Sequence, residues 1–282
     1  MRESIRTYPF AGCLFFRQIL LLALVLVPLS AAASPPNPPL RVTIASFSFP
    51  PLLHTARDNV FSGTMGETVK YLCEVASITC NFTVMPLKRA YQKVRSGASN
   101  ALITINVGQL TNCCIPSDWA SPWTAGFFSS AGAEEIPKSA KDLTGRSMIM
   151  VNGMKSPYFF AKNLDQMAAD KRLTLWKAPN ILSSVKMFLR KRAPLLWGGE
   201  DFMWYIHKLD KNATYSFKPL FKKPVVIWVR KDKPEVLALF NRIFAKVKAA
   251  GQLDSKNLLI PALMQQRYID APFQGTHDPE FP

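Results

Sequence analysis

An alternation of apolar strands and amphipathic helices limits the folds of this chain more than any other feature. The first part of the pattern reads strand 42–46, helix 64–76, strand 81–85, helix 87–95 and strand 101–105. It starts again with strand 147–151, a helix from 157, a strand near 173–176, helix 181–190, strand 193–197 and a helix from 201. Strands that alternate with helices form parallel sheets covered by helices on both faces. Two such units predict two α/β lobes.

A third stretch adds strand 223–232 and a long amphipathic helix over 233–253, which Gly251 ends. One face of this helix is apolar and is expected to pack against the core. Its residues are Leu237, Phe240, Ile243, Phe244 and Val247.

The first 33 residues have the composition of an export signal. Three arginines precede the apolar run 19–29, and three alanines at 31–33 are small enough for a signal peptidase. The apolar run is shorter than the roughly 20 residues that span a bilayer. We therefore expect cleavage near Ala33, a proline-rich linker at 34–40 and a mature protein in the periplasm.

The chain is strongly basic, since 35 Lys and Arg against 19 Asp and Glu give a net charge of +16. Residues 1–33 hold three of the basic residues and one acidic residue, so their removal leaves 32 minus 18, or +14. Basic proteins bind nucleic acids, membranes or small anions. The lysines of the final third are spread out, without a compact run or a nucleic-acid motif. This spacing favours a solvated surface and predicts no nucleic-acid partner.

Four cysteines remain after the expected cleavage, and cysteines of exported proteins tend to oxidise. Cys73 is expected near the end of a helix and Cys80 at the start of the next strand, so a bridge between them is favoured. Cys113 and Cys114 then either form a strained vicinal bridge or stay reduced. The three histidines have no ligand spacing to the cysteines, so no metal site is predicted.

Five segments in the right order resemble bacterial periplasmic solute-binding proteins of the amino-acid-binding type, family 3. They read "SFSFPPL" (46–52), "MPLKRAYQKVRSGASNALIT" (85–104), "SDWASPW" (117–123), "SAKDLTGRSMIMVNG" (139–153) and "KPEVLALFNRIFAKVKAAGQL" (233–253). The resemblance runs from about Arg41 to Tyr268.

The resemblance implies a type II periplasmic-binding-protein-like α/β fold, with two lobes and a ligand cleft between them. Lobe 1 would hold residues 41–128 and 226–270, lobe 2 residues 129–225, and residues 271–282 would form a tail. Crossings between the lobes are expected near 127–131 and 218–227. Ligands of such sheets bind outside the carboxyl ends of the strands.

The segment "GMKSP" (153–157) has the residues of a helix start beside this cleft. Ser156 is a favourable N-cap and Pro157 suits the first helical position. The free backbone N–H groups and Lys155 would then hold an anionic group of the solute. An ordinary capped helix that binds nothing is the alternative.

Other candidates lie at the expected strand ends. The resemblance matches one of two adjacent acids with the second-lobe carboxylate that receives the ammonium of an amino acid, although either acid is equally suited to be a helix N-cap. The aromatic residues either stack on the solute or belong to the core. These candidates are Phe47, Phe49, Thr104, Asn106, Trp119, Trp123, Glu200 and Asp201.

One departure from the family concerns the arginine that clamps the α-carboxylate soon after the third strand. The corresponding stretch "TINVGQLTNCCIPSDW" contains no arginine, and no Arg or Lys occurs between Arg95 and Lys138. The carboxylate would therefore be held by the Ser156 turn, by Arg89 or not at all.

Three functions fit these features. The first is a monomeric receptor that binds a small polar or anionic, amino-acid-like solute for an ABC permease, without chemistry or cofactor. The second is a dehydratase-like enzyme with Glu200 as general acid, although the chain lacks metal, GxSxG and phosphate-loop motifs. The third is a sensory module that signals to a membrane partner.

Overall fold

The computed structural model describes residues 40–55, 60–106 and 108–270. The expected export signal, the linker up to residue 39 and the C-terminal tail lie outside the described residues. Within the described part of the chain, no helix is both long and apolar enough to cross a membrane.

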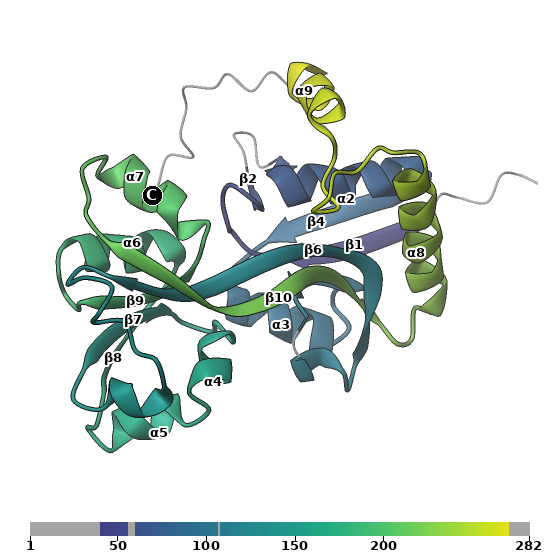
Figure 1. The fold of residues 1–282 in the computed structure, drawn as a ribbon. Helices are drawn as coiled ribbons and strands as arrows, with labels where there is room; N and C mark the ends of the chain where they lie inside the picture. Colours follow the sequence, from purple (N-terminus) through teal and green to yellow (C-terminus); the bar gives the residue numbers. More distant parts are fainter. Residues whose placement is uncertain (1–39, 56–59, 107, 271–282) are drawn as a thin grey trace, which may run out of the picture. The chain divides into compact units, whose positions relative to one another are not determined.

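The described strands form an eight-stranded sheet in the order β4-β1-β5-β10-β6-β9-β7-β8 and a separate β2-β3 pair (Figure 1). Their bounds are β1 Arg41–Ser46, β2 His54–Thr55, β3 Phe61–Ser62, β4 Thr79–Val84, β5 Ala101–Ile105, β6 Cys114–Ser129, β7 Ser147–Val151, β8 Thr174–Ala178, β9 Leu195–Gly199 and β10 Ser216–Arg230. Strand β1 is parallel to β4 and β5, and β7 is parallel to β8 and β9. Between these two parallel groups lies the long antiparallel ribbon of β6 and β10.

The helices follow the strands in the alternation that the sequence predicts. They are α2 Thr64–Val75, α3 Leu87–Arg95, α4 Pro157–Phe160, α5 Leu164–Ala169, α6 Ile181–Leu189, α7 Phe202–Leu209, α8 Pro234–Ala249 and α9 Pro261–Asp270, with short 3₁₀ turns η2 Gly108–Leu110 and η3 Ala140–Leu143. Four residues of the predicted apolar face of α8 are buried, whereas Leu237 is only half-buried.

Strand β6 is the longest element that the sequence pattern did not predict. Its sequence "CIPSDWASPWTAGFFS" holds two prolines, and proline argues against a strand inside a sheet because it has no N–H to donate. In the structure Pro122 lies opposite Pro224 of β10, so the two residues without an N–H face each other in the ribbon. The start of β10 at Ser216 likewise precedes the predicted strand.

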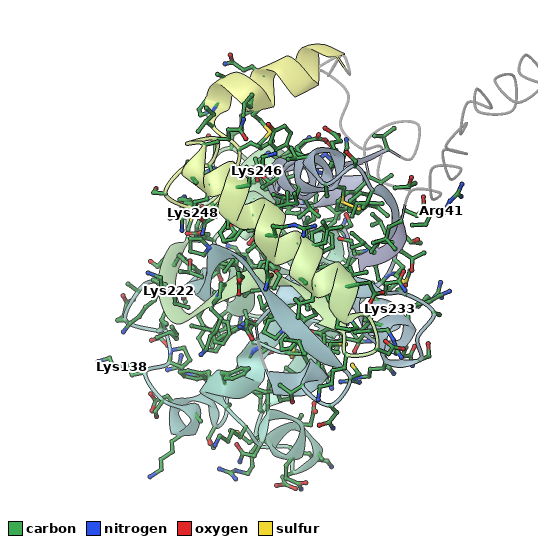
Figure 2. All side chains as sticks on the ribbon, turned by 90° about the vertical axis from the view of Figure 1, so that its right-hand side faces the viewer. Arg41, Lys138, Lys222, Lys233, Lys246 and Lys248 are labelled. Carbon is green, nitrogen blue, oxygen red and sulfur yellow. A yellow bond between two sulfur atoms is a disulfide. The ribbon has the colours of Figure 1, made fainter. Side chains whose placement is uncertain are left out.

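The cations that Figure 2 labels come from several parts of the chain. Lys246 and Lys248 are close neighbours on α8, Arg41 begins β1, Lys222 lies in β10, and Lys138 and Lys233 lie outside the helices and strands. Five of the six are exposed, and Lys233 is half-buried. This spread agrees with the solvated surface that the sequence spacing favours.

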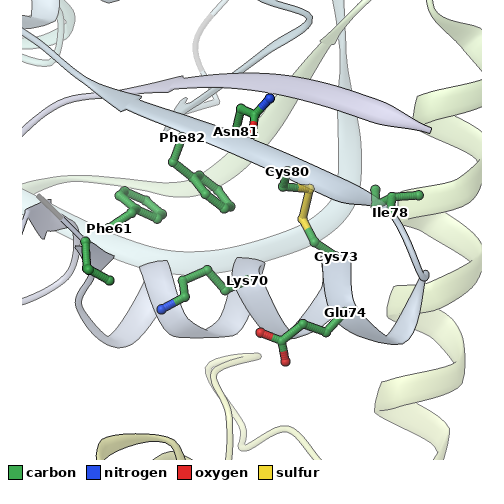
Figure 3. Close-up of a pocket in the computed structure, with 9 residues that line it drawn as sticks. Phe61, Lys70, Cys73, Glu74, Ile78, Cys80, Asn81 and Phe82 are labelled. Atoms are coloured by element: carbon green, nitrogen blue, oxygen red, sulfur yellow. A yellow bond between two sulfur atoms is a disulfide. The ribbon is translucent and has the colours of Figure 1, made fainter. Parts of the chain in front are cut away.

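The predicted disulfide between Cys73 and Cys80 is confirmed, with 6.2 Å between the two Cα atoms. It ties the last turn of α2 to β4 and lines a surface hollow together with Phe61 and Phe82, whose rings stack at 4.3 Å (Figure 3). Cys113 and Cys114 are free thiols.

Candidate functional site

The carboxyl ends of the two parallel groups meet at the middle of the β6–β10 ribbon. Ile105, the last residue of β5, pairs with Val225, which pairs in turn with Ser121 of β6. Gly199, the last residue of β9, pairs with Ala125 of β6. Because β5 and β9 approach the ribbon from opposite directions, their ends face residues 121–125 of β6. Ligands of α/β sheets bind at such ends.

A row of aromatic rings lies at this position. Phe47 and Phe49, after β1, have ring centroids 5.5 Å apart, and Phe49 lies 5.6 Å from Trp123 of β6. Trp123 contacts Phe221 of β10 at 6.2 Å, and Phe221 contacts Phe159 of α4 at 5.1 Å. The central rings are buried, whereas Phe159 is 49% exposed. The row therefore connects residues that follow β1 with residues that follow β7.

Asp201, immediately before α7, brings a carboxylate to this row. Its Oδ1 atom accepts a hydrogen bond of 2.9 Å from the Trp123 indole Nε1. Gly199 allows this contact, since an added Cβ would lie 2.2 Å from Asp201 Oδ1 and 2.5 Å from the Trp123 ring. The second oxygen, Oδ2, is buried and accepts no hydrogen bond. A buried polar atom without a partner is rare in folded proteins and needs an explanation.

The environment of Asp201 favours its neutral form. Burial raises the pKa of the Asp201 carboxyl to about 7, and the charge of Glu200 also raises it. The hydrogen bond from Trp123 and the residue's own backbone amide oppose this rise. A donor placed at Oδ2, above all a cationic one, would lower the pKa again because it stabilises the charged form.

Ser48 and Tyr205 join the row from opposite sides, and sequence reasoning missed both. The Ser48 side chain hydrogen-bonds Tyr205, one turn after Asp201. Burial raises the pKa of the Tyr205 phenol, and the nearby Asp201 charge raises it further. Phe159 and Phe221 were also missed. Two features of the sequence could have indicated these residues. Ser48 lies between two predicted aromatic candidates, and Phe159 belongs to the aromatic segment "SPYFF" that follows the predicted helix start.

Two candidates at the end of β5 contact neighbouring elements. Thr104 is buried, and its hydroxyl shares a hydrogen bond of 3.2 Å with the Tyr91 hydroxyl of α3. The Asn106 backbone N–H donates to the Pro224 carbonyl at 2.7 Å. Both residues thus lie at the predicted strand end.

Trp119 and Arg89 lie apart from the aromatic row in the contacts that the structure shows. Trp119 is buried, and its indole donates to the Asn257 carbonyl at 2.9 Å, near the C-terminal part of the described chain. Arg89 lines a surface hollow with Gln92, Lys93 and other residues of α3. Glu200 is exposed, whereas its neighbour Asp201 is buried.

Ser156 lies at the N-cap position and Pro157 begins α4, as predicted, but the expected capping hydrogen bond is not formed. Ser156 itself has helical backbone angles, its side chain makes no capping bond, and α4 has only four residues. The hydroxyl is fully buried and accepts a hydrogen bond of 3.0 Å from the Trp197 indole of β9. The predicted capping bond is absent because the tertiary fold offers the hydroxyl a buried donor, which the local sequence does not reveal. The hydrogen bond from Lys177 is the main reason why the pKa of the Asp165 carboxyl is lowered, and the charge of Lys155 also lowers it.

The described residues contain no cluster of three or more metal-ligating side chains. The side-chain groups at the strand ends are a carboxylate, hydroxyls and aromatic rings. They offer a carboxylate oxygen of Asp201 without a partner, beside rings that present apolar faces. The hydroxyls of Ser46, at the end of β1, and Ser121, in β6, are also buried without a partner.

No family model and no curated protein matches the sequence of this chain. Solved structures do match. An ancestral arginine-binding protein bound to arginine is 18% identical, with a TM-score of 0.60 over 75% of this chain and 93% of that one. A substrate-binding protein of an ABC uptake transporter from Streptococcus pneumoniae, with bound histidine, is 15% identical, with a TM-score of 0.62 over 75% and 88%.

A histidine kinase sensor domain with similarity to periplasmic binding proteins is 16% identical, with a TM-score of 0.61 over 85% of this chain and 98% of that domain. At these identities the likeness shows the fold. The chain has the two-lobe α/β fold of periplasmic binding proteins, as the sequence resemblance implied.

Proposed function

We propose that this chain is an exported solute-binding protein that captures a small, amino-acid-like solute at the strand ends and delivers it to an ABC-type permease. The solute would bind beside Trp123, where the carboxyl ends of β5 and β9 face each other across the ribbon. Capture would need no bond to form or break.

The unpartnered Oδ2 atom of Asp201 is the observation that supports this proposal most strongly. A solute ammonium would supply the missing hydrogen bond and charge, and charge-assisted bonds of this kind are stronger than neutral ones. Because Oδ2 is covered in the present conformation, the solute would reach it when the covering side chains separate. The body of the solute would pack against the aromatic row.

The similarity in fold to solved binding proteins supports the same function but does not identify the solute. The matched proteins that are named with bound arginine or histidine have amino acids as ligands. The clamping arginine of the family is missing here, so an amino-acid-like solute need not keep a free α-carboxylate. Recognition through the amine and the body of the solute is the part that the contacts favour.

Several further features belong to the same proposal. We infer lobes of 41–128 with 226–270 and of 129–225, removal of residues 1–33, a periplasmic location and a monomer. The Trp123–Phe221 ring contact and the Ser48–Tyr205 hydrogen bond join residues of the two inferred lobes. These contacts fit the closed form of such a receptor.

Mass spectrometry of the natively purified protein tests the proposal. We expect a small amine-bearing solute to co-purify, and added solute at 100 times its dissociation constant should stabilise the fold by about 2.7 kcal/mol. The solute should be recovered unchanged. Conversion of the solute would favour the dehydratase-like enzyme, with Asp201 rather than the exposed Glu200 as the acid to test first.

The sensory module is a second candidate, because the kinase sensor domain matches 85% of this chain. Binding alone does not distinguish a receptor from a sensor. Crosslinking in cells would do so: a receptor is expected to capture a permease, and a sensor a signalling protein of the membrane.

A further inference from the structure

Two neighbouring cysteines outside the strand-end site hold their sulfur atoms unusually close. Cys113 follows the η2 turn and Cys114 begins β6, and their Sγ atoms are 2.7 Å apart. This separation is only about 0.7 Å longer than a disulfide bond. Since the residues are adjacent, no distant segment has to move for the sulfurs to meet.

The two thiols differ in access, and the more buried one has a raised pKa. Cys113 is half-buried, and its Sγ donates a weak hydrogen bond of 3.4 Å to the Leu110 carbonyl. Cys114 is 2% exposed, and burial is the main reason why the pKa of its thiol rises to about 12. The bond to Cys113 and the charges of Cys113 and Asp232 also raise this pKa, whereas Arg230 lowers it.

We propose that Cys113 and Cys114 form a thiol–disulfide exchange site, which takes a small or protein disulfide as its substrate and closes into a vicinal disulfide. The Cys113 thiolate attacks one sulfur of the substrate disulfide, and a mixed disulfide and one free thiolate result. The Cys114 thiolate then attacks Cys113 Sγ, forms the Cys113–Cys114 bond and expels the second thiolate. The two protons of the cysteines pass to the two released thiolates, and the substrate leaves as two thiols.

The local electrostatics explain the order of these steps. Cys113 is the more accessible sulfur, so it meets the substrate first. In the mixed disulfide Cys113 no longer carries a thiol proton or a charge, so both of its contributions to the high pKa of Cys114 are removed. Burial and the Asp232 charge still raise the pKa of the Cys114 thiol, and the Arg230 guanidinium lowers it.

The proposed bond would differ from Cys73–Cys80 in how easily it is reduced. The Cα atoms of adjacent residues are about 3.8 Å apart across a trans peptide, below the usual range of about 4.4 to 6.8 Å for disulfides. The Cα atoms of Cys73 and Cys80 are 6.2 Å apart, within that range. Strained disulfides are the labile ones, so the vicinal bond is expected to open under milder reduction. This inference does not depend on the proposed function.

Oxidised glutathione provides the test. The exported chain without residues 1–33, with Cys113 and Cys114 reduced and Cys73–Cys80 intact, is treated with it, and the remaining thiols are blocked with iodoacetamide before peptide mapping. We expect the wild-type peptide to carry an internal disulfide and neither glutathione nor the blocking group. Cys114→Ser should instead accumulate glutathione on Cys113, and Cys113→Ser should react on the order of tenfold more slowly than Cys114→Ser because its remaining sulfur is buried.

Three outcomes would overturn the proposal. In the first, both sulfurs of the wild-type protein take the blocking group. In the second, the wild-type protein retains glutathione on Cys113. In the third, Cys113→Ser reacts as fast as Cys114→Ser. A graded return to reduced glutathione should open the new bond before Cys73–Cys80. Simultaneous loss of both bonds would contradict the expected strain.

Discussion

Two turns at the strand ends each place a buried hydrogen-bond acceptor before a helix, but they differ in whether the acceptor is fully hydrogen-bonded. The turn after β7 places Ser156 before α4, and the turn after β9 places Asp201 before α7. Neither side chain caps its helix, and each is buried and accepts an indole N–H, from Trp197 at 3.0 Å and from Trp123 at 2.9 Å.

The difference between the two turns lies in what remains after the indole bond. The Ser156 hydroxyl has a partner, whereas Asp201 keeps a buried oxygen without one. A satisfied group serves packing, and an unsatisfied one is available to a ligand. The comparison teaches that unmet hydrogen-bonding capacity, more than a helix-start pattern, indicates where a solute binds.

The largest expected effect is a pH dependence of the unfolding free energy, which the Asp201 turn should cause and the Ser156 turn should not. Because burial raises the pKa of Asp201 to about 7, the folded protein keeps a proton that the unfolded chain releases above its ordinary pKa of 3.8. The free energy of unfolding should therefore fall as pH rises from 4 to 7, by about 4 kcal/mol at most. Asp201→Asn should remove this fall, as measured by urea unfolding across that range.

Glu200→Gln is the matched control, since it removes the exposed neighbouring acid. It should leave most of the pH dependence in place, with a small change because the Glu200 charge contributes to the shift. Wild-type and Asp201→Asn curves that run parallel from pH 4 to 7 would show that Asp201 titrates normally.

The next effect concerns the co-purified solute. Asp201→Asn should lower the affinity for an amine-bearing solute by about ten- to a hundredfold, the range for the loss of a hydrogen bond to a charged group. Ser156→Ala should change its affinity by less than about threefold, because the hydroxyl is already bonded to Trp197. Calorimetry on the folded variants measures both. Equal losses in the two variants would remove the distinction between the turns.

The smallest effect is on stability at the Ser156 turn. Ser156→Ala leaves the fully buried Trp197 indole N–H without an acceptor, which should cost about 1 to 2 kcal/mol of unfolding free energy. Ser255→Ala, at an exposed position, is the control and should cost almost nothing. A harmless Ser156→Ala would mean that water or another group replaces the hydroxyl.

The sequence by itself determined the alternation of strands and helices, and it determined the disulfide. Both depend on neighbours along the chain: periodic apolar residues define the buried face of each element, and seven positions separate Cys73 from Cys80 across one turn. Strand β6 escaped this reasoning because Pro116 and Pro122 break the local pattern, while its pairing with β10 comes from a segment about a hundred residues away.

The tertiary structure alone decided which polar groups are satisfied. Nothing in "GMKSP" reveals that Trp197 will reach Ser156, and nothing in "GGED" separates the exposed Glu200 from the buried Asp201. Hydrogen-bond partners and burial depend on which distant segments pack together, and local propensity carries no information about either. The sequence could thus place the candidate site at the strand ends, but only the packing of β6 against β9 and α7 selected Asp201 within it.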